Sequence, residues 1–139
     1  MLLLARRHLK AIVDRAEAAW PEECCGLLVG RRGPGSLWRV DRVEPSPNLA
    51  EDRRRAFEVD PALRFRLERA LRGRDLGVVG HYHSHPTGPA RPSAADLGRA
   101  YEPGLAWLIV ALCDGQAVES AAFAPVPGGF RRLDLVTRN

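Results

Sequence analysis

The chain has 139 residues, of which 45% are hydrophobic and 27% are charged, fractions that are ordinary for a soluble globular protein. This length is sufficient to bury roughly two-thirds of the unfolded surface without disulfides, so we expect a single domain over residues 1–139. The formal net charge of +4 permits an acidic partner or nucleic acid but requires neither.

The N-terminal residues predict a short strand followed by a helix. Met1–Leu4 is apolar, but Arg6 follows almost at once, so this stretch is too short for a signal peptide or a membrane span. We therefore expect a cytoplasmic protein that makes no membrane contact. Residues 5–20 carry apolar side chains at helical spacing, the last of them Trp20, and Pro21 ends the pattern.

Residues 24–43 predict a β-hairpin. The apolar run Cys24–Gly30 suits a buried strand, Gly33–Gly35 suits a turn, and Leu37–Val43 suits a second strand.

The three cysteines do not form a disulfide framework. Cys24 and Cys25 are adjacent and Cys113 is distant, and no pair has the Cys-x-x-Cys spacing of a structural zinc site. We expect buried, reduced thiols in a reducing compartment.

A charged loop and a second helix come next. Residues 45–50 are expected to be loop, Glu51–Arg55 a solvated charged run, and Phe57–Val59 a short strand. Asp60-Pro61 is typical of a helix start, and Gly73 of a helix end. The apolar stripe of this helix consists of Leu63, Leu67, Ala70 and Leu71. Its arginines are expected to face solvent.

The second half of the chain contains mostly strand patterns. Residues 76–85 predict a strand and residues 93–101 a helix. Leu105–Cys113 has no polar member, which predicts a strand covered on both faces. Asp114-Gly115 predicts a two-residue hairpin turn into the next strand, and Phe130–Val136 predicts a last strand. We expect one mixed sheet flanked by helices, an α/β fold.

The chemistry of the chain is concentrated between His83 and Asp96. His83 and His85 are two residues apart, so on a strand they project from the same face. Ser93 and Asp96 have the spacing of a capping box, a purely structural alternative. Together, two imidazoles and a carboxylate form a three-ligand set suited to zinc, with a fourth position open for water.

Hydrolysis at such a metal also needs a group that moves protons. Glu23 lies where the first helix gives way to the strand that begins at Cys24, a position from which it could reach a metal on a neighbouring strand. The alternative for Glu22 and Glu23 is a solvent-exposed pair.

These residues carry a family resemblance. Pro21-Glu22-Glu23-Cys24-Cys25-Gly26-Leu27-Leu28-Val29-Gly30, followed by His83-Ser84-His85-Pro86 and Ser93-Ala94-Ala95-Asp96, resembles the JAMM metalloprotease family, also called the MPN+ or JAB domain. The resemblance covers nearly the whole chain in element order and is closest to the short, stand-alone prokaryotic type. It implies a JAB/MPN fold, which is cytidine-deaminase-like.

The resemblance also implies roles for particular residues. His83, His85 and Asp96 resemble the family's zinc ligands, Glu23 its general base and acid, and Ser93 its oxyanion donor. Two further residues stay open: Asn48 could match a recurrent loop asparagine, and His81 is in phase with the other two histidines, so a histidine triad at the metal is conceivable.

The implied function is hydrolysis of a peptide or isopeptide bond by a zinc-activated water at the C-terminal tail of a ubiquitin-like or sulfur-carrier protein. One alternative is a non-catalytic MPN-type scaffold, which the intact ligand set disfavours. Another alternative is a RadC-like, nucleic-acid-associated protein, but the sequence of the strand that follows Glu23 argues against membership of that group. A nucleobase deaminase and a serine hydrolase lack their own motifs here.

Overall fold

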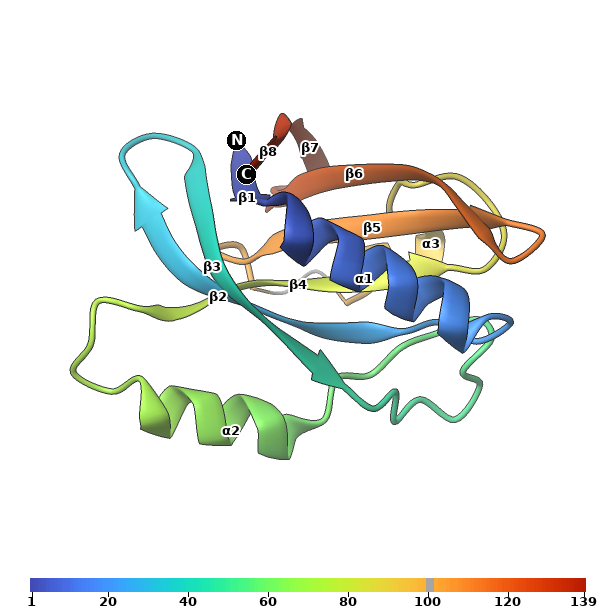
Figure 1. Ribbon diagram of the computed structural model, residues 1–139, viewed down its shortest axis with the longest axis horizontal. Coiled ribbons are helices and arrows are strands. Elements are labelled where there is room, and N and C mark those ends of the chain that lie inside the picture. Colours follow the sequence, from blue (N-terminus) through green and yellow to red (C-terminus); the bar gives the residue numbers. More distant parts are fainter. Residues whose placement is uncertain (100–101) are drawn as a thin grey trace.

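The computed structural model describes residues 1–99 and 102–139 (Figure 1). Over these residues, eight strands form one mixed sheet in the order β7-β6-β5-β4-β2-β3-β1-β8. The strands are β1 Leu2–Ala5, β2 Cys25–Gly33, β3 Leu37–Ser46, β4 Gly77–His85, β5 Ala106–Cys113, β6 Gln116–Val126, β7 Gly129–Leu133 and β8 Leu135–Arg138. The helices are α1 Arg6–Ala19, α2 Pro61–Ala70 and α3 Ala94–Leu97. The expected mixed sheet flanked by helices is confirmed.

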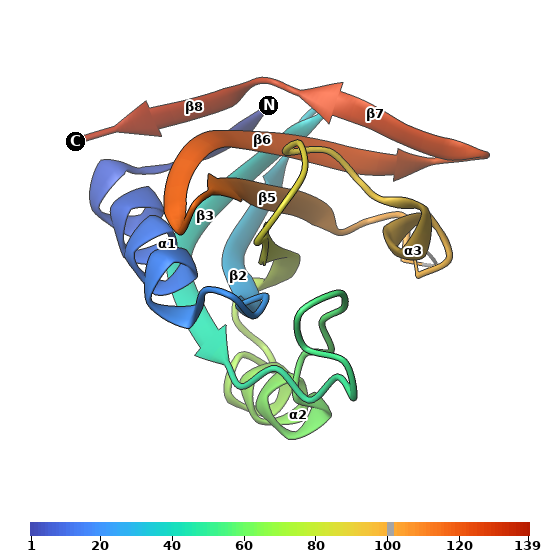
Figure 2. The same ribbon diagram turned by 90° about the vertical axis from the view of Figure 1, so that its right-hand side faces the viewer.

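The curled sheet separates α1 from the other two helices (Figure 2). α1 buries Ile12 and Ala16 in the main core, together with side chains such as Leu28 and Tyr82 from the central strands. Its helical pattern is confirmed, but Trp20 is 45% exposed. The reason is that α1 ends at Ala19, so Trp20 leaves the apolar stripe.

The opposite face of the central strands packs against α2. Leu27 and Val29 of β2 contact Leu63 and Leu67 of the helix. Since side chains alternate along a strand, Leu28 of the same strand faces α1 instead. Asp60 caps α2 as expected, its carboxylate accepting a hydrogen bond from the backbone N–H of Ala62.

Two expected hairpins are present. β2 pairs antiparallel with β3, and β5 with β6. At the second turn Asp114 and Gly115 both have positive φ, 52° and 80°, as a two-residue turn of the primed type needs. β5 is buried from Ala106 to Leu112, which confirms the prediction of a strand covered on both faces.

The last predicted strand, Phe130–Val136, is two strands in the structure. β7 pairs with β6 at one edge of the sheet, and β8 pairs with β1 at the other. Between them the carbonyl oxygen of Asp134 accepts a hydrogen bond from the Leu2 N–H at 2.8 Å. Because the sheet curls, one extended segment reaches both edges of the sheet (Figure 2). The alternation of apolar and polar residues in this segment does not encode which strand each half pairs with.

Five smaller expectations were wrong. Not all arginines of α2 face solvent, because Arg64 is partly buried and pairs with Glu102. Phe57–Val59 forms only an isolated bridge between Val59 and Asn48, because no long strand lies beside it. The helix predicted over 93–101 ends at Leu97, and residues 100–101 of that prediction lie outside the described residues. Ala70 is exposed on α2, because only Leu63, Leu67 and Leu71 face the sheet. Cys113 is exposed, because it ends β5 at the hairpin.

No helix within the described ranges is long and apolar enough to cross a membrane.

Candidate metal centre

β4 presents two histidines to the face that carries α2. His83 and His85 alternate with Tyr82 and Ser84, and His83 is fully buried. Their Nε2 atoms lie 3.2 Å apart. Phe57 stacks on the His83 ring with a centroid distance of 4.1 Å, which fixes the plane of that imidazole.

Asp96 completes the group from the first turn of α3. Its Oδ2 lies 3.3 Å from His83 Nε2 and 3.1 Å from His85 Nε2. The same oxygen accepts a hydrogen bond from the Ser93 N–H, and the Asp96 N–H donates to Ser93 Oγ, so a complete capping box is present. The structural and the metal-binding interpretations of this motif are therefore compatible, since the cap holds the carboxylate facing the imidazoles.

The donor atoms fit a small divalent cation. The His85 Nδ1–H donates to the Pro89 carbonyl oxygen at 2.9 Å, so Nε2 is the ring nitrogen that faces His83 and Asp96 and would bind a metal. The separations of 3.1–3.3 Å match the edge of a zinc tetrahedron, about 3.3 Å for bond lengths of about 2.0–2.1 Å. Among the described residues, His83, His85 and Asp96 form the group that could hold a metal ion. We call it the metal-capable group.

Burial and charge both act on these side chains. Burial lowers the pKa of His83. Burial works against the ionised forms of His85 and Asp96, but other interactions prevail. The hydrogen bond with Asp96 raises the pKa of His85, and the hydrogen bonds with His83 and His85 hold the pKa of Asp96 below its usual range. Asp96 is therefore an anion at neutral pH, as a carboxylate ligand of a metal ion must be.

Glu23 lies next to this group. The register of β2 against β4 pairs Cys25 with His83, which brings Glu23 to the end of β4. The side chain is 6% exposed, and its Oε1 has no hydrogen-bond partner among the described residues. Burial raises the pKa of Glu23 to about 7, with smaller opposing effects of the charges on His85 and Asp96. The solvent-exposed alternative is wrong for Glu23.

The backbone around Glu23 is held from three directions. The Glu23 N–H donates to the Arg53 carbonyl oxygen at 2.7 Å, and its carbonyl oxygen accepts from Asn48 Nδ2 at 2.9 Å. The next N–H, of Cys24, donates to Ser84 Oγ at 2.8 Å. Sequence reasoning missed Ser84; the available signal was its place between His83 and His85, pointing to the opposite face.

Asn48 makes four side-chain hydrogen bonds, three within its own loop and one to Glu23. Nδ2 donates to the carbonyl oxygens of Glu23 and Ala56, and Oδ1 accepts from the N–H groups of Ala50 and Glu58. Asn48 therefore ties the loop before α2 to Glu23.

Ser93 and Glu23 line the same cavity, together with His85. Ser93 Oγ accepts a hydrogen bond from Asp96 N–H, so its own hydroxyl proton is free to be donated into that cavity. In the described ranges, Cys24 and Cys25 belong to no metal-capable group, and burial raises the pKa of the Cys25 thiol to about 12.

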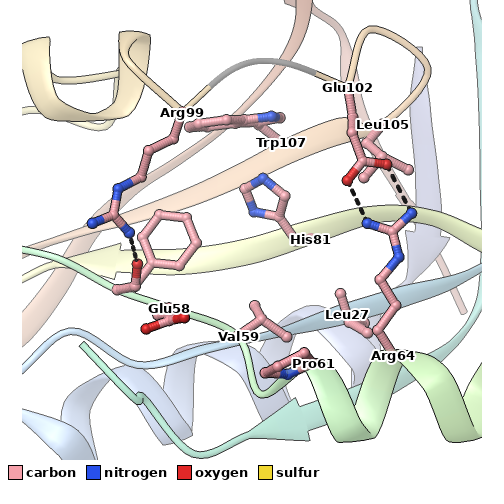
Figure 3. A pocket seen from close by; sticks show the side chains of 11 residues that line it. Leu27, Glu58, Val59, Pro61, Arg64, His81, Arg99, Glu102, Leu105 and Trp107 are labelled. Atoms are coloured by element: carbon pink, nitrogen blue, oxygen red, sulfur yellow. Dashed lines mark hydrogen bonds and ion pairs between the residues drawn. The ribbon is translucent and has the colours of Figure 1, made fainter.

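His81 lies outside the metal-capable group found in the described residues, which corrects the idea of a histidine triad. Its ring packs on Trp107 with a centroid distance of 4.4 Å. It belongs to a second cavity of about 290 Å³, shown in Figure 3. The charged side chains of that cavity are two arginines and two glutamates, Arg64, Arg99, Glu58 and Glu102. We call it the neutral cavity.

The curled mixed sheet, with two strand histidines and a capped aspartate at one end, defines the class of JAB/MPN metal-site domains. Residues 5–124 match the model of the Prok-JAB family, described as prokaryotic homologs of the JAB domain. The chain belongs to this family.

Three curated relatives are similar to this chain. The desampylase of Haloferax volcanii is 37% identical over 64% of this chain and 62% of its own length. The "Probable TtuB-protein conjugate cleaving protease" of Thermus thermophilus is 39% identical over 58% of this chain and 50% of its own length. The CysO-cysteine peptidase of Mycobacterium tuberculosis is 30% identical over 92% of this chain and 85% of its own length. The chain thus spans 62% and 50% of the first two relatives.

Solved structures agree with the fold. The protein DSY2949 from Desulfitobacterium hafniense superposes with a TM-score of 0.85 at 32% identity, covering 99% of this chain and 93% of that one. A JAB1/MPN domain protein from Archaeoglobus fulgidus superposes with a TM-score of 0.61 at 24% identity, covering 98% of this chain and 99% of that one. This likeness bears on the fold alone.

Proposed function

We propose that this protein is a zinc metallopeptidase that hydrolyses a peptide or isopeptide bond at the C-terminal tail of a ubiquitin-like or sulfur-carrier protein. The observation that carries this proposal is the convergence of His83, His85 and Asp96, with Glu23 and Ser93 lining the adjoining cavity. The printed names of the relatives, a desampylase, a conjugate-cleaving protease and a CysO-cysteine peptidase, support the substrate class.

In this proposal His83, His85 and Asp96 hold the zinc ion. Two neutral imidazoles and one carboxylate leave a fourth position open, as catalytic zinc sites require. When bound, zinc supplies Lewis-acid chemistry, which lowers the pKa of water and polarises a carbonyl group.

Glu23 is the proton carrier. A carboxylate takes the proton of the attacking water and passes it to the leaving nitrogen, while the carbon–nitrogen bond breaks and the acyl carbon keeps the hydroxyl group. The burial of Glu23 and its unpartnered Oε1 support this role, because that oxygen is available for a water or a substrate proton.

Ser93 donates its hydroxyl proton to the oxygen on which negative charge develops. Removal of one such donor typically costs about 100- to 1,000-fold in rate. The hydrogen bond that Ser93 Oγ accepts from Asp96 N–H supports the assignment, because it orients the hydroxyl group without using its proton.

We also infer that the protein acts in the cytoplasm. The thiols of Cys24 and Cys25 are free and buried, which suits a reducing compartment.

The test uses the zinc-loaded protein and ubiquitin-fold carriers extended beyond a C-terminal Gly-Gly, with products identified by mass spectrometry. We expect trimming at that tail, and we expect Glu23→Gln to lower the rate by at least about 100-fold while bound zinc is unchanged. An active Glu23→Gln variant would remove Glu23 from the mechanism. A protein that binds no metal would instead be a scaffold of the MPN type.

A further inference from the structure

A basic cavity opens beside the metal-capable group. Its volume is about 300 Å³, and Glu23, His85 and Ser93 contribute to its lining. The other charged side chains of the lining are all arginines, namely Arg54, Arg55 and Arg91. Three guanidinium groups therefore surround the residues to which we assign proton transfer and oxyanion binding.

The basic cavity and the neutral cavity lie on either side of the metal-capable group. Along β4, His81 lines the neutral cavity and His85 the basic cavity, with His83 between them. The loop before α2 has the matching order, since Arg55 lines the basic cavity and Phe57 the neutral one. A substrate segment that crosses the metal-capable group therefore extends toward both cavities.

The segment that follows β4 repeats this order. Ser93 lines the basic cavity, Asp96 belongs to the metal-capable group, and Arg99 lines the neutral cavity. Three separate segments thus agree on which side of the metal-capable group each cavity lies.

The cations of the neutral cavity already have partners. Arg64 Nη2 lies 2.8 Å from Glu102 Oε2, and Arg99 donates a hydrogen bond to the Phe57 carbonyl oxygen (Figure 3). This side therefore suits an uncharged stretch of substrate, packed against apolar side chains such as Leu27 and Trp107.

The cations of the basic cavity are less well neutralised. Within residues 1–99 and 102–139, neither Arg54 nor Arg91 takes part in an ion pair, and Arg55 has a contact of 4.0 Å with Asp52 at a largely exposed position. Glu23 is the single acidic residue of the lining. Guanidinium groups bind carboxylates through paired hydrogen bonds, so this cavity suits an anionic group.

The position of Glu23 decides which half of the substrate meets these arginines. The group that delivers the proton to the leaving nitrogen must lie beside that nitrogen, and Glu23 lines the basic cavity. The leaving half therefore enters the basic cavity. One extended residue spans about 3.5 Å, so the α-carboxylate of a single leaving residue stays within reach of the arginines.

We propose that Arg54, Arg55 and Arg91 bind the free α-carboxylate of the leaving group, so that the protein releases a C-terminal amino acid rather than detaching a carrier from a protein lysine. This specificity rests on the proposed function. The carrier tail occupies the neutral side of the metal-capable group, and the released amino acid occupies the basic side.

The experiment compares two forms of one substrate: a ubiquitin-fold carrier ending in Gly-Gly-Ala with a free carboxylate, and the same carrier ending in a C-terminal amide. We expect kcat/KM to be about 10- to 100-fold higher for the free acid. A double variant, Arg54→Ala with Arg91→Ala, should reduce this preference to less than about 3-fold, because the charge-assisted hydrogen bonds are lost.

The control is the double variant Arg66→Ala with Arg72→Ala. Both side chains are exposed, and neither lines a cavity near the metal-capable group. This control removes the same charge, so it reports any general attraction of an acidic carrier, and it should retain the preference for the free acid.

Two results would overturn the inference while leaving the proposed function intact. The first is equal hydrolysis of acid and amide by the unaltered protein. The second is faster hydrolysis of a carrier joined to a peptide lysine than of the free acid. Failure to cleave any carrier would refute the proposed function itself, and this inference with it.

Discussion

Asn48 offers the sharpest test of how the fold positions Glu23. Asn48→Ala removes four hydrogen bonds at once, including the one that Nδ2 donates to the Glu23 carbonyl oxygen at 2.9 Å. A hydrogen bond contributes about 0.5–1.5 kcal/mol, so we expect the loss of four to lower the free energy of unfolding by about 2–6 kcal/mol.

The same substitution should lower kcat/KM, and kcat in particular, by about 10- to 100-fold. The reason is that small displacements of a catalytic group are costly, and the Glu23 carbonyl loses its restraint. Zinc content should stay the same, because none of the four hydrogen bonds of Asn48 goes to a residue of the metal-capable group. The measurements are chemical denaturation, elemental analysis, and steady-state kinetics at a temperature well below the thermal midpoint of the variant.

Ser46→Ala is the matched control, because Ser46 ends β3 at the start of the same loop. Ser46 Oγ accepts a hydrogen bond from the Asp60 N–H at 2.8 Å and donates one to the Pro47 carbonyl oxygen, so its loss loosens the loop without touching Glu23. We expect a destabilisation of about 1–3 kcal/mol and little change in kcat. An Asn48→Ala variant with unaltered kcat, or a Ser46→Ala variant with an equal loss of kcat, would refute the reasoning.

Three further outcomes follow from the site and the core. Ser93→Ala should lower kcat/KM by about 100-fold and stability by about 1 kcal/mol, with zinc retained on elemental analysis. Asp96→Asn should weaken zinc binding by about 100-fold or more in a chelator competition, because the anion between the imidazoles is lost; unchanged affinity would exclude Asp96 as a ligand. With a disulfide reagent, Cys113 should react rapidly, whereas Cys24 and Cys25 should react only after unfolding. The reason is that both are buried and that the pKa of Cys25 is raised to about 12. Three thiols that react equally fast would contradict the described core.

Local patterns could be predicted because their physical causes are local. The alternation of a strand placed His83 and His85 on one face, and the geometry of a first helical turn joined Ser93 to Asp96. The glycine of the Cys-Gly-Leu-Leu stretch has a less local cause, since a Cβ at Gly26 would overlap the Tyr82 ring on the neighbouring strand.

Long-range placement depended on how the strands pair. Glu23 reaches His85 because Cys25 pairs with His83, and neither the spacing nor the composition of the chain encodes that register. The same holds for Arg54 and Arg91, which come together from two loops that only the curled sheet brings to one cavity.

The amino-acid sequence alone therefore determined the first two helices, the hairpins, the buried strand β5 and the candidate ligand set, because each depends on neighbours within a turn or a strand. The tertiary structure decided that Trp20 and Cys113 are exposed, how the last segment divides between two sheet edges, and which charges face the metal-capable group. The physical reason is that periodicity specifies which face a side chain occupies, whereas the partner across that face is chosen by the packing of the whole sheet.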